Sequence, residues 1–271
     1  MAKKKNLKGI DEIEMEFINE KLKRVSSTDY LNEDNMVSVN AIKALNFKLN
    51  IKCKNEKQKE FLNQLNNKNK ELCFGIGSPG TGKSFISLSY ALKAIKDGLY
   101  SNIVMIIPTA QAGGADLSIG FLKGDFEEKV SPFCEADKET IGKILKLSGN
   151  SSYNEIANTL VNRGIVKHEY VNFLLGKTID DSIILVNQAE QYTKSNMRLI
   201  LTRIGINSKI IITGDSKQVN RKSIKNNIEE CGLTYACDHL IDLDEVSVTE
   251  FNENDIVRNG LITKILNKFD N

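Results

Sequence analysis

The octapeptide GSPGTGKS, residues 77–84, carries the clearest chemical signal in the sequence. It matches the pattern G-x-x-x-x-G-K-[ST], in which glycines allow successive backbone N–H groups to converge on one anion. A helix starting at Ser84 adds its dipole, Lys83 can reach the outer phosphates, and the Ser84 hydroxyl can bind Mg²⁺. We therefore expect ATP and Mg²⁺ to bind here. The expected phosphate-binding residues are Gly77, Ser78, Pro79, Gly80, Thr81, Gly82, Lys83 and Ser84.

A weaker clue lies upstream, in the segment QKEFLNQL. Its glutamine, Gln58, precedes Gly77 by 19 residues. In helicase-like ATPases a glutamine in such a place reads the edge of the adenine ring. A polar residue on a surface helix explains the same letter equally well, so both interpretations stand.

A phosphate loop needs a strand before it and a helix after it, and the sequence supplies both repeatedly. Short apolar runs alternate with helical segments from about residue 50. Continuous apolar runs separated by helices predict a parallel sheet covered on both faces, hence an α/β fold. The runs are LCFGIG (72–77), NIVMIIP (102–108), SIILVN (182–187), KIIITGD (209–215) and, more weakly, EVSVTEF (245–251).

Two helices support this prediction. SFISLSYALKAIKDG (84–98) carries apolar residues on one face and stops at Gly98. TKSNMRLILTRIG (193–205) begins with Thr193 or Ser195 as a cap and ends near Gly205. Each follows an apolar run, as a sheet flanked by helices requires.

The first fifty residues differ from the rest. Ile10, Ile13, Phe17 and Leu22 recur at helical spacing and predict an amphipathic helix. This helix either packs on its own domain or docks as an arm on a neighbouring subunit. We expect residues 1–50 to be an N-terminal extension and residues 51–271 to be the core domain.

Bulk properties limit the class of protein. A chain of 271 residues with 41% hydrophobic content can bury one sizeable core, and its net charge of +2 is neutral on nucleic-acid binding. The apolar runs are too short to span a bilayer, so we expect no membrane partner. Five cysteines without a C-x-x-C pair favour reduced thiols in a cytoplasmic protein. We interpret both histidines, His168 and His239, as structural.

Four further segments occur in the order of a known family. They are GFLKGDFEEKVSPF (120–133), YVNFLLGKTIDDSIIL (170–185), NMRLILTRIGINSKIIITGDSKQVN (196–220) and NDIVRNGLITKIL (254–266). Together with the phosphate loop, this order resembles the PhoH family of P-loop ATPases over residues 50 to 268. The core of that family is similar to superfamily 1 helicases, which implies a RecA-like or helicase-like P-loop NTPase fold. Lys123 stands where the family usually has proline, and Asn220 where it has aspartate.

The resemblance implies roles for residues outside the loop. Thr213, Asp215 and Gln218 are expected near the γ-phosphate or the attacking water, although Asp215 can instead cap a turn. Arg203 and Arg258 are candidates for an arginine finger, within one subunit or across an interface, and surface ion pairs are the alternative. The resemblance also implies a homo-oligomer, with a hexameric ring as one form, and single-stranded RNA as a partner.

The segment VNQAEQ departs from the family at two positions. Asn187 stands at the aspartate that holds the Mg²⁺ shell, and Gln188 at the glutamate that activates water. An amide brings no charge to a hard cation, and glutamine cannot accept a proton at neutral pH. Losing a positioned general base typically costs about 10² to 10⁴ in rate. Glu190 and Asp215 are the candidates to replace it.

The leading prediction is a PhoH-like, RNA-related, oligomeric ATP-binding protein whose hydrolysis is impaired by Asn187 and Gln188. The alternative is an active RNA-dependent ATPase motor that uses Glu190 or Asp215 as its base. A small-molecule phosphotransferase is disfavoured, because an arginine-rich lid is missing.

Overall fold

The computed structural model describes residues 46–108, 126–215 and 230–257, with backbone alone for 126–133. Several predicted features lie outside these residues. They are the N-terminal helix, the segment 120–125, Gln218 and Arg258.

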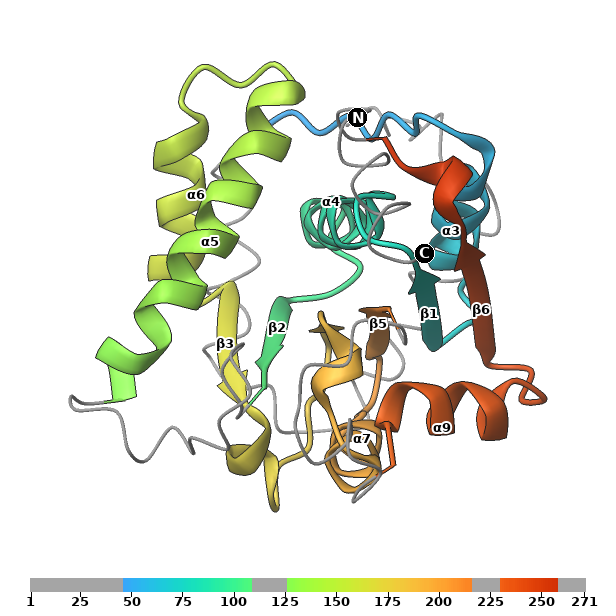
Figure 1. Ribbon diagram of the computed structural model, residues 1–271. Helices are drawn as coiled ribbons and strands as arrows, with labels where there is room; N and C mark the ends of the chain where they lie inside the picture. Colours follow the sequence, from blue (N-terminus) through green and yellow to red (C-terminus); the bar gives the residue numbers. More distant parts are fainter. Residues whose placement is uncertain (1–45, 109–125, 216–229, 258–271) are drawn as a thin grey trace, which may run out of the picture.

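A six-stranded sheet with the order β3-β2-β4-β5-β1-β6 forms the centre of the molecule (Figure 1). The strands are β1 (Leu72–Gly77), β2 (Asn102–Ile107), β3 (Val166–Tyr170), β4 (Ser182–Val186), β5 (Lys209–Gly214) and β6 (Val246–Phe251). Every neighbouring pair is parallel. The carboxyl ends of all the strands therefore meet at one edge of the sheet, where ligands of open α/β sheets bind.

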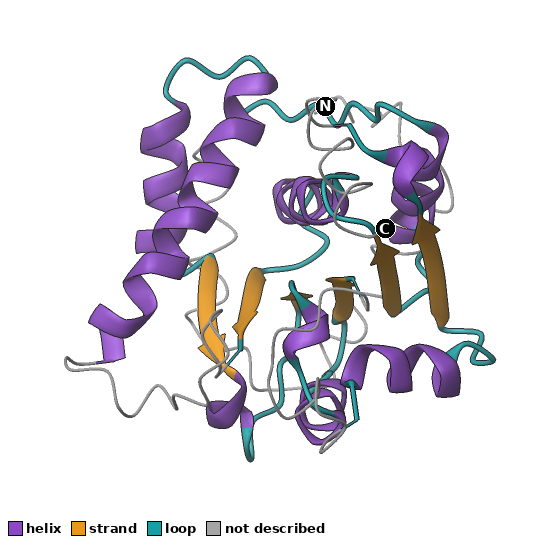
Figure 2. Ribbon diagram, in the orientation of Figure 1, coloured by secondary structure: helices purple, strands orange, loops and turns teal. Residues whose placement is uncertain are grey.

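Helices cover both faces of this sheet (Figure 2). One layer holds α3 (Glu56–Asn66), α4 (Lys83–Lys96), α5 (Phe126–Leu147) and α6 (Tyr153–Asn162). The opposite layer holds α7 (Lys194–Leu201) and α9 (Gly232–Leu240). Short 3₁₀ helices are η2 (Val171–Leu174), η3 (Ala189–Gln191) and η4 (Glu253–Asp255).

The strand sequences explain this double cover. Successive side chains of a strand point to opposite faces, so a strand buried on both sides reads as a continuous apolar run. Cys73 and Met105 join the core under α3 to α6, whereas their chain neighbours Phe74 and Ile106 join the core under α7 and α9. Burying one such side chain typically contributes about 1.5 to 3 kcal/mol. The two hydrophobic cores, one on each face, hold the sheet rigid. The carboxyl ends of the strands are thereby fixed in position.

The helix starts follow capping chemistry. The side chain of Asn55 accepts a hydrogen bond from the Gln58 N–H at the start of α3. Thr193 does the same for the Asn196 N–H at the start of α7, which decides between Thr193 and Ser195 in favour of Thr193. Helix α7 ends at Leu201, ahead of the predicted stop near Gly205.

The predicted α/β class and all five apolar strands are confirmed. The strand at TGD, β5, lies between the loop strand β1 and the SIILVN strand β4. Strand β3 was not predicted from the sequence, because it is an edge strand whose middle residues are partly exposed and show no continuous apolar run. Phe47, four residues ahead of the predicted domain start, is 2% exposed and belongs to the core.

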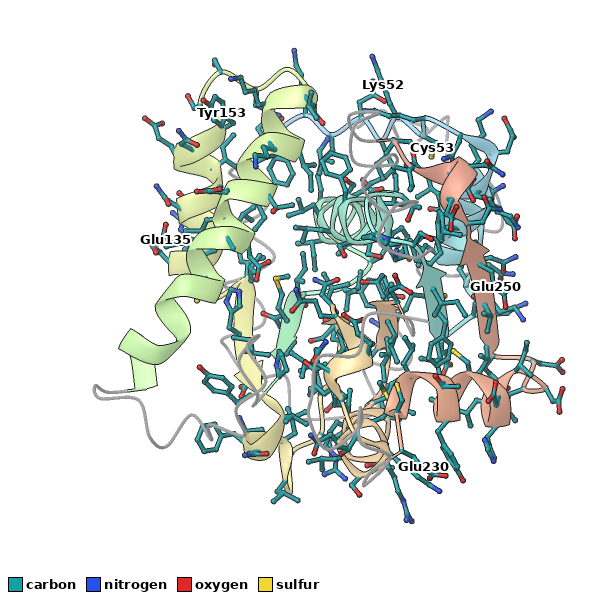
Figure 3. All side chains as sticks on the ribbon, in the orientation of Figure 1. Lys52, Cys53, Glu135, Tyr153, Glu230 and Glu250 are labelled. Atoms are coloured by element: carbon teal, nitrogen blue, oxygen red, sulfur yellow. The ribbon has the colours of Figure 1, made fainter. Side chains whose placement is uncertain are left out.

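Many charged residues lie on the outside of the fold, whereas Lys83, Glu190, Lys209, Asp215 and Asp255 are buried. Figure 3 shows Glu135 on α5, Glu250 on β6 and Glu230 ahead of α9 at the periphery of the molecule. All five cysteines are free thiols. Within the described ranges, no helix has both the length and the apolar character needed to cross a membrane.

Candidate functional site: a phosphate-binding loop at the sheet edge

The loop of residues 77–84 runs from the end of β1 into α4, as the sequence predicted. Gly77 has a φ of 121°, in the region that favours glycine. A Cβ atom at Gly77 would lie 1.9 Å from the carbonyl oxygen of Phe251 at the end of β6. The loop continues with positive φ at Gly80 and Gly82. Its shape therefore depends on glycines at positions where L side chains are strained or blocked.

Lys83 points into the loop. Its ammonium donates hydrogen bonds to the carbonyl oxygens of Gly77 (2.6 Å) and Ser78 (2.7 Å). The residue is only 8% exposed, and the ammonium lies 5.9 Å from the centroid of the Phe251 ring. A positive charge is thus held at the centre of the loop, where phosphate oxygens bind in proteins of this type.

Gln58 contacts the loop from α3. Its Nε2 donates to the Thr81 carbonyl oxygen at 2.7 Å, and its Oε1 accepts from the Lys54 N–H at 2.7 Å. Gln58 is 3% exposed, so the interpretation as a surface residue is wrong. A Cβ at Gly82 would lie 2.6 Å from Gln58 Nε2. The amide therefore braces the loop from behind, and its role in reading adenine stays a prediction.

A chain of hydroxyl and amide groups joins the loop to β5 and β4. Ser84 Oγ lies 3.2 Å from Thr213 Oγ1, and Thr213 Oγ1 donates to Asn187 Oδ1 at 2.7 Å. Because the Thr213 proton is directed at Asn187, the Ser84 hydroxyl donates to Thr213 in this arrangement. Ser84 and Asn187, the two predicted metal-binding residues, are therefore brought to one place.

Gln188 stands beside this chain in an unusual backbone conformation. Its φ and ψ are 53° and 46°, in the left-handed region, and its side chain is exposed. A non-glycine residue in this region is uncommon and often marks a functional turn. The position predicted for the catalytic acid is therefore at the surface of the sheet edge, and it holds an amide.

Glu190 and Asp215 are both buried at this edge, 6% and 7% exposed. Glu190 Oε2 accepts the backbone N–H of Asp215 at 2.9 Å. Burial raises the pKa of the Glu190 carboxyl, and the hydrogen bond from Asp215 N–H offsets only part of this effect. Glu190 is thus bound to the backbone at the end of β5.

A cavity of about 320 Å³ opens over the loop. It is lined by Gly77, Ser78 and Asp215 on one side and by the end of β6 with η4, residues 251–254, on the other. Asp215 is a lining residue, whereas Glu190 is not. The η4 side was missed in the sequence, because no local pattern shows that residues 251–257 return to the loop. Val257 N–H donates to the Gly80 carbonyl oxygen at 3.1 Å.

Arg203 lies at the amino ends of the strands, opposite the carboxyl ends that carry the phosphate loop. Its guanidinium donates to the Lys177 carbonyl oxygen at 3.0 Å. Its own carbonyl accepts the N–H of Ile179, just ahead of the first residue of β4. The phosphate loop follows the last residue of a parallel strand, so a finger role for Arg203 within the same subunit is wrong. Helix α7 runs back from the carboxyl ends of the strands to their amino ends, and Arg203 lies beyond its last residue. A finger role for Arg203 across a subunit interface stays a prediction.

The residues present fit a nucleotide phosphate chain, because glycines shape the loop and Lys83 is buried within it. They fit Mg²⁺ less well. The side chains aligned for it, Ser84 and Asn187, are neutral, and hard cations prefer carboxylate oxygens. Within the described residues, no group of three or more His, Cys, Asp or Glu side chains could hold a metal ion.

A parallel α/β sheet with this loop between its first strand and the following helix defines a P-loop protein of the NTPase type. The family model of PhoH-like proteins matches residues 50–270. The chain therefore belongs to the PhoH family, a family of P-loop ATPases, and the resemblance found in its sequence is confirmed.

Three known relatives are between 27% and 33% identical to this chain over the aligned residues. The PhoH-like protein of Bacillus subtilis is 33% identical over 221 residues, which cover 81% of this chain and 64% of the relative. The PhoH-like protein of Mycobacterium tuberculosis H37Rv is 27% identical over 73% of this chain and 52% of its own length. Protein PhoH of Escherichia coli K12 is 27% identical over 81% and 58%, respectively. The chain thus spans between half and two thirds of these relatives.

Proposed function

We propose that this protein binds ATP through the loop of residues 77–84 and hydrolyses it slowly. The observation that carries the proposal is the chain Ser84–Thr213–Asn187. This chain of contacts supports the assignment of Asn187, a neutral amide, to the position where a P-loop ATPase holds Mg²⁺ with a carboxylate. The buried Lys83 supports binding, and the neutral pair Asn187 and Gln188 argues for weak turnover.

Two further parts of the proposal rest on the family resemblance. They are assembly as a homo-oligomer, with a hexameric ring as one form, and action on single-stranded RNA in the cytoplasm. A mass measurement of the assembly with and without ATP tests the first. Retention of RNA by the protein, with and without nucleotide, tests the second.

Turnover is the experiment that tests slow hydrolysis. Purified full-length protein is incubated with ATP and Mg²⁺, with and without single-stranded RNA, beside the double variant Asn187→Asp, Gln188→Glu. Restoring the metal-binding charge and the base should raise the rate by about 10² or more. Lys83→Ala is the control, because it should abolish nucleotide binding in either background. A double variant that binds ATP and turns over no faster than the unmodified protein would contradict the assignment of Asn187 and Gln188.

The alternative is an active RNA-dependent ATPase whose base is a different acid. Asp215 is favoured over Glu190 for that role, because Asp215 lines the cavity beside Gly77 and Ser78. Brisk turnover of the unmodified protein, abolished in both Lys83→Ala and Asp215→Asn, would establish this alternative.

A further inference from the structure

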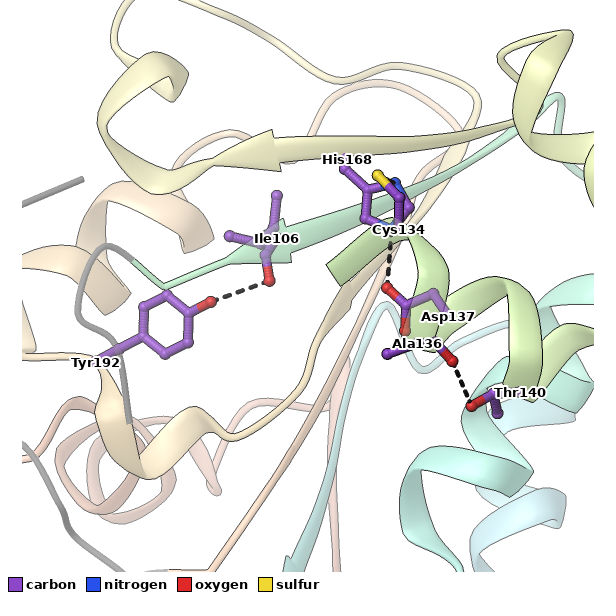
Figure 4. Close-up of polar contacts among 7 residues, drawn as sticks. All are labelled: Ile106, Cys134, Ala136, Asp137, Thr140, His168 and Tyr192. Atoms are coloured by element: carbon purple, nitrogen blue, oxygen red, sulfur yellow. Dashed lines mark hydrogen bonds and ion pairs between the residues drawn. The ribbon is translucent and has the colours of Figure 1, made fainter. Parts of the chain in front are cut away.

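A second set of reactive side chains lies away from the phosphate loop, between α5 and β3 (Figure 4). Cys134 Sγ lies 3.3 Å from Nδ1 of His168, and Nε2 of His168 lies 2.8 Å from Asp137 Oδ2. Cys134 and Asp137 are one helical turn apart on α5, and His168 faces them from the edge strand β3. His168 is therefore not isolated, because its two ring nitrogens contact Cys134 and Asp137.

The hydrogen-bonding groups fix the positions of the protons in this set. A carboxylate can only accept, so the hydrogen of His168 that faces Asp137 is on Nε2. In the neutral imidazole, Nδ1 then carries a lone pair directed at Cys134, and the thiol donates to it. This is the order of nucleophile, base and orienting acid found where thiols are activated.

The surroundings of Cys134 disfavour ionisation of its thiol. A reaction of this thiol therefore needs a base that removes its proton. Cys134 is half-buried beside Ile107 and Tyr170. Burial raises the pKa of the Cys134 thiol, with Asp137 and Glu135 adding to the rise and Lys138 opposing it. A thiol in such a place reacts when a neighbour takes its proton during attack. The side chain of His168 is 4% exposed, which keeps water from competing for Nδ1.

A metal site is the other chemistry that such residues could perform. Over the ranges that the structure describes, the geometry of Cys134, His168 and Asp137 does not form a cluster able to hold a metal ion. The linear order of sulfur, imidazole and carboxylate suits proton transfer along a line, whereas ligands of one ion converge on a point.

We propose that Cys134 is a thiol-modification site that reacts with small-molecule disulfides, with His168 as its base and Asp137 as a positioning residue. The Cys134 sulfur attacks one sulfur of the disulfide while its proton moves to His168 Nδ1. A new S–S bond joins Cys134 to one half of the reagent. The other half leaves as a thiolate and takes the proton from His168, so neither atoms nor electrons are left over.

The chain supplies its own comparison. Cys231 is also a half-buried free thiol, and its contact is with the Glu190 carbonyl oxygen at 4.0 Å. Cys53 is half-buried too, and burial likewise raises its pKa. Both differ from Cys134 in having no recorded contact with a histidine ring among the described residues. Their reaction rates therefore give the reactivity of a half-buried thiol that has no histidine base beside it.

The test uses the full-length reduced protein and glutathione disulfide at neutral pH, with peptide mapping by mass spectrometry to follow each cysteine. Cys134 should form the mixed disulfide roughly 10²-fold faster than Cys231 or Cys53, the lower end of what a positioned base supplies. Equal rates at the three thiols would overturn the proposal, and this comparison needs no variant.

Two variants separate the roles. His168→Asn should lower the Cys134 rate to that of Cys231, and an unchanged rate in the folded variant contradicts the assignment of the base. Asp137→Asn should retain most reactivity but move the pH of half-maximal rate downward, because Asp137 is one of the charges that raise the pKa of the Cys134 thiol. The other ionisable groups facing Cys134 are Glu135 and Lys138 on α5 and Tyr170 on β3, and they are unchanged. A purely structural Asp137 would leave that pH unmoved.

Discussion

The hydroxyl of Thr213 donates to the amide oxygen of Asn187 over 2.7 Å, and so ties the end of β5 to the end of β4. Thr213 also contacts Ser84, the last residue of the phosphate loop. One buried hydroxyl therefore sets the positions of both predicted metal-binding residues. A carboxylate at position 187 would accept the same hydrogen bond, so the neighbourhood remains compatible with the family's aspartate.

Thr213→Val should weaken the coupling between Mg²⁺ and nucleotide binding. The variant removes the hydrogen bonds to Ser84 and Asn187, and loss of such bonds costs about 0.5 to 1.5 kcal/mol each. Thr249→Val is a matched control, since Thr213 and Thr249 pair with the same residue, Gly75, from its two sides. Within the described residues, the Thr249 hydroxyl is buried without a hydrogen-bond partner. Calorimetric titration of ATP with and without Mg²⁺ should change in the first variant alone.

Gly77→Ala should abolish nucleotide binding and reduce the free energy of unfolding. Its Cβ would collide with the Phe251 carbonyl oxygen, so β6 or the loop must move. Gly98→Ala is the control, because Gly98 also has a positive φ, of 72°, and has no heavy atom within 4 Å of an added Cβ. That variant should cost about 1 to 2 kcal/mol, the strain of the left-handed conformation alone. Thermal unfolding and ATP titration of the two proteins give the comparison, and equal losses would contradict the role of the close contact.

Gln58→Ala should lower both stability and ATP affinity. The change leaves the Thr81 carbonyl and the Lys54 N–H without the partner that now satisfies them, at a cost of about 1 to 3 kcal/mol for a buried group. Asn63→Ala, on the exposed side of the same helix, should have little effect. Adenine recognition adds a separate expectation: the loss of affinity in Gln58→Ala should then be larger for ATP than for inorganic triphosphate. Equal losses would limit Gln58 to bracing the loop.

Glu190 should make stability depend on pH. Burial raises the pKa of its carboxyl above the ordinary 4.5 of the unfolded chain. Between these two pKa values the folded state binds more protons, so the free energy of unfolding falls as pH rises through this window and levels off above it. Glu190→Gln keeps an acceptor for the Asp215 N–H and should remove this part of the slope. Denaturant unfolding at a series of pH values measures it, with Glu155→Gln, an exposed residue of α6, as the control for the charge change.

The sequence revealed those elements whose burial is two-sided. Strands β1, β2, β4 and β5 are covered on both faces, and each reads as an apolar run. Strand β3 is at the sheet edge and is buried only at its two end residues, Val166 and Tyr170, so VKHEY shows little of that signal. A run is visible in the letters only where packing demands apolar residues at successive positions.

The phosphate loop was also predictable, because its chemistry lies within eight consecutive residues. Contacts made between distant segments were not. Gln58 reaches a carbonyl 23 residues away, and Cys134 meets a histidine 34 residues away. Arg203 shows the opposite error. A motif suggested that it lies at the site, whereas it lies beyond the end of α7, at the amino ends of the strands. Local patterns specify elements, and tertiary packing decides which polar side chains meet.

The place of β1 in the sheet has a consequence for folding during synthesis on the ribosome. Among the strands that the structure describes, β1 is the first to leave the ribosome, yet its hydrogen-bonding partners, β5 and β6, are the last two. Leu72 pairs with Ile210 on one side and Val246 on the other. The strand that carries the phosphate loop thus waits with both edges open until the rest of the sheet has been synthesised. A ribosome that stalls before residue 246 would release a chain with an unpaired apolar edge, a template for aggregation that a chaperone or protease must meet.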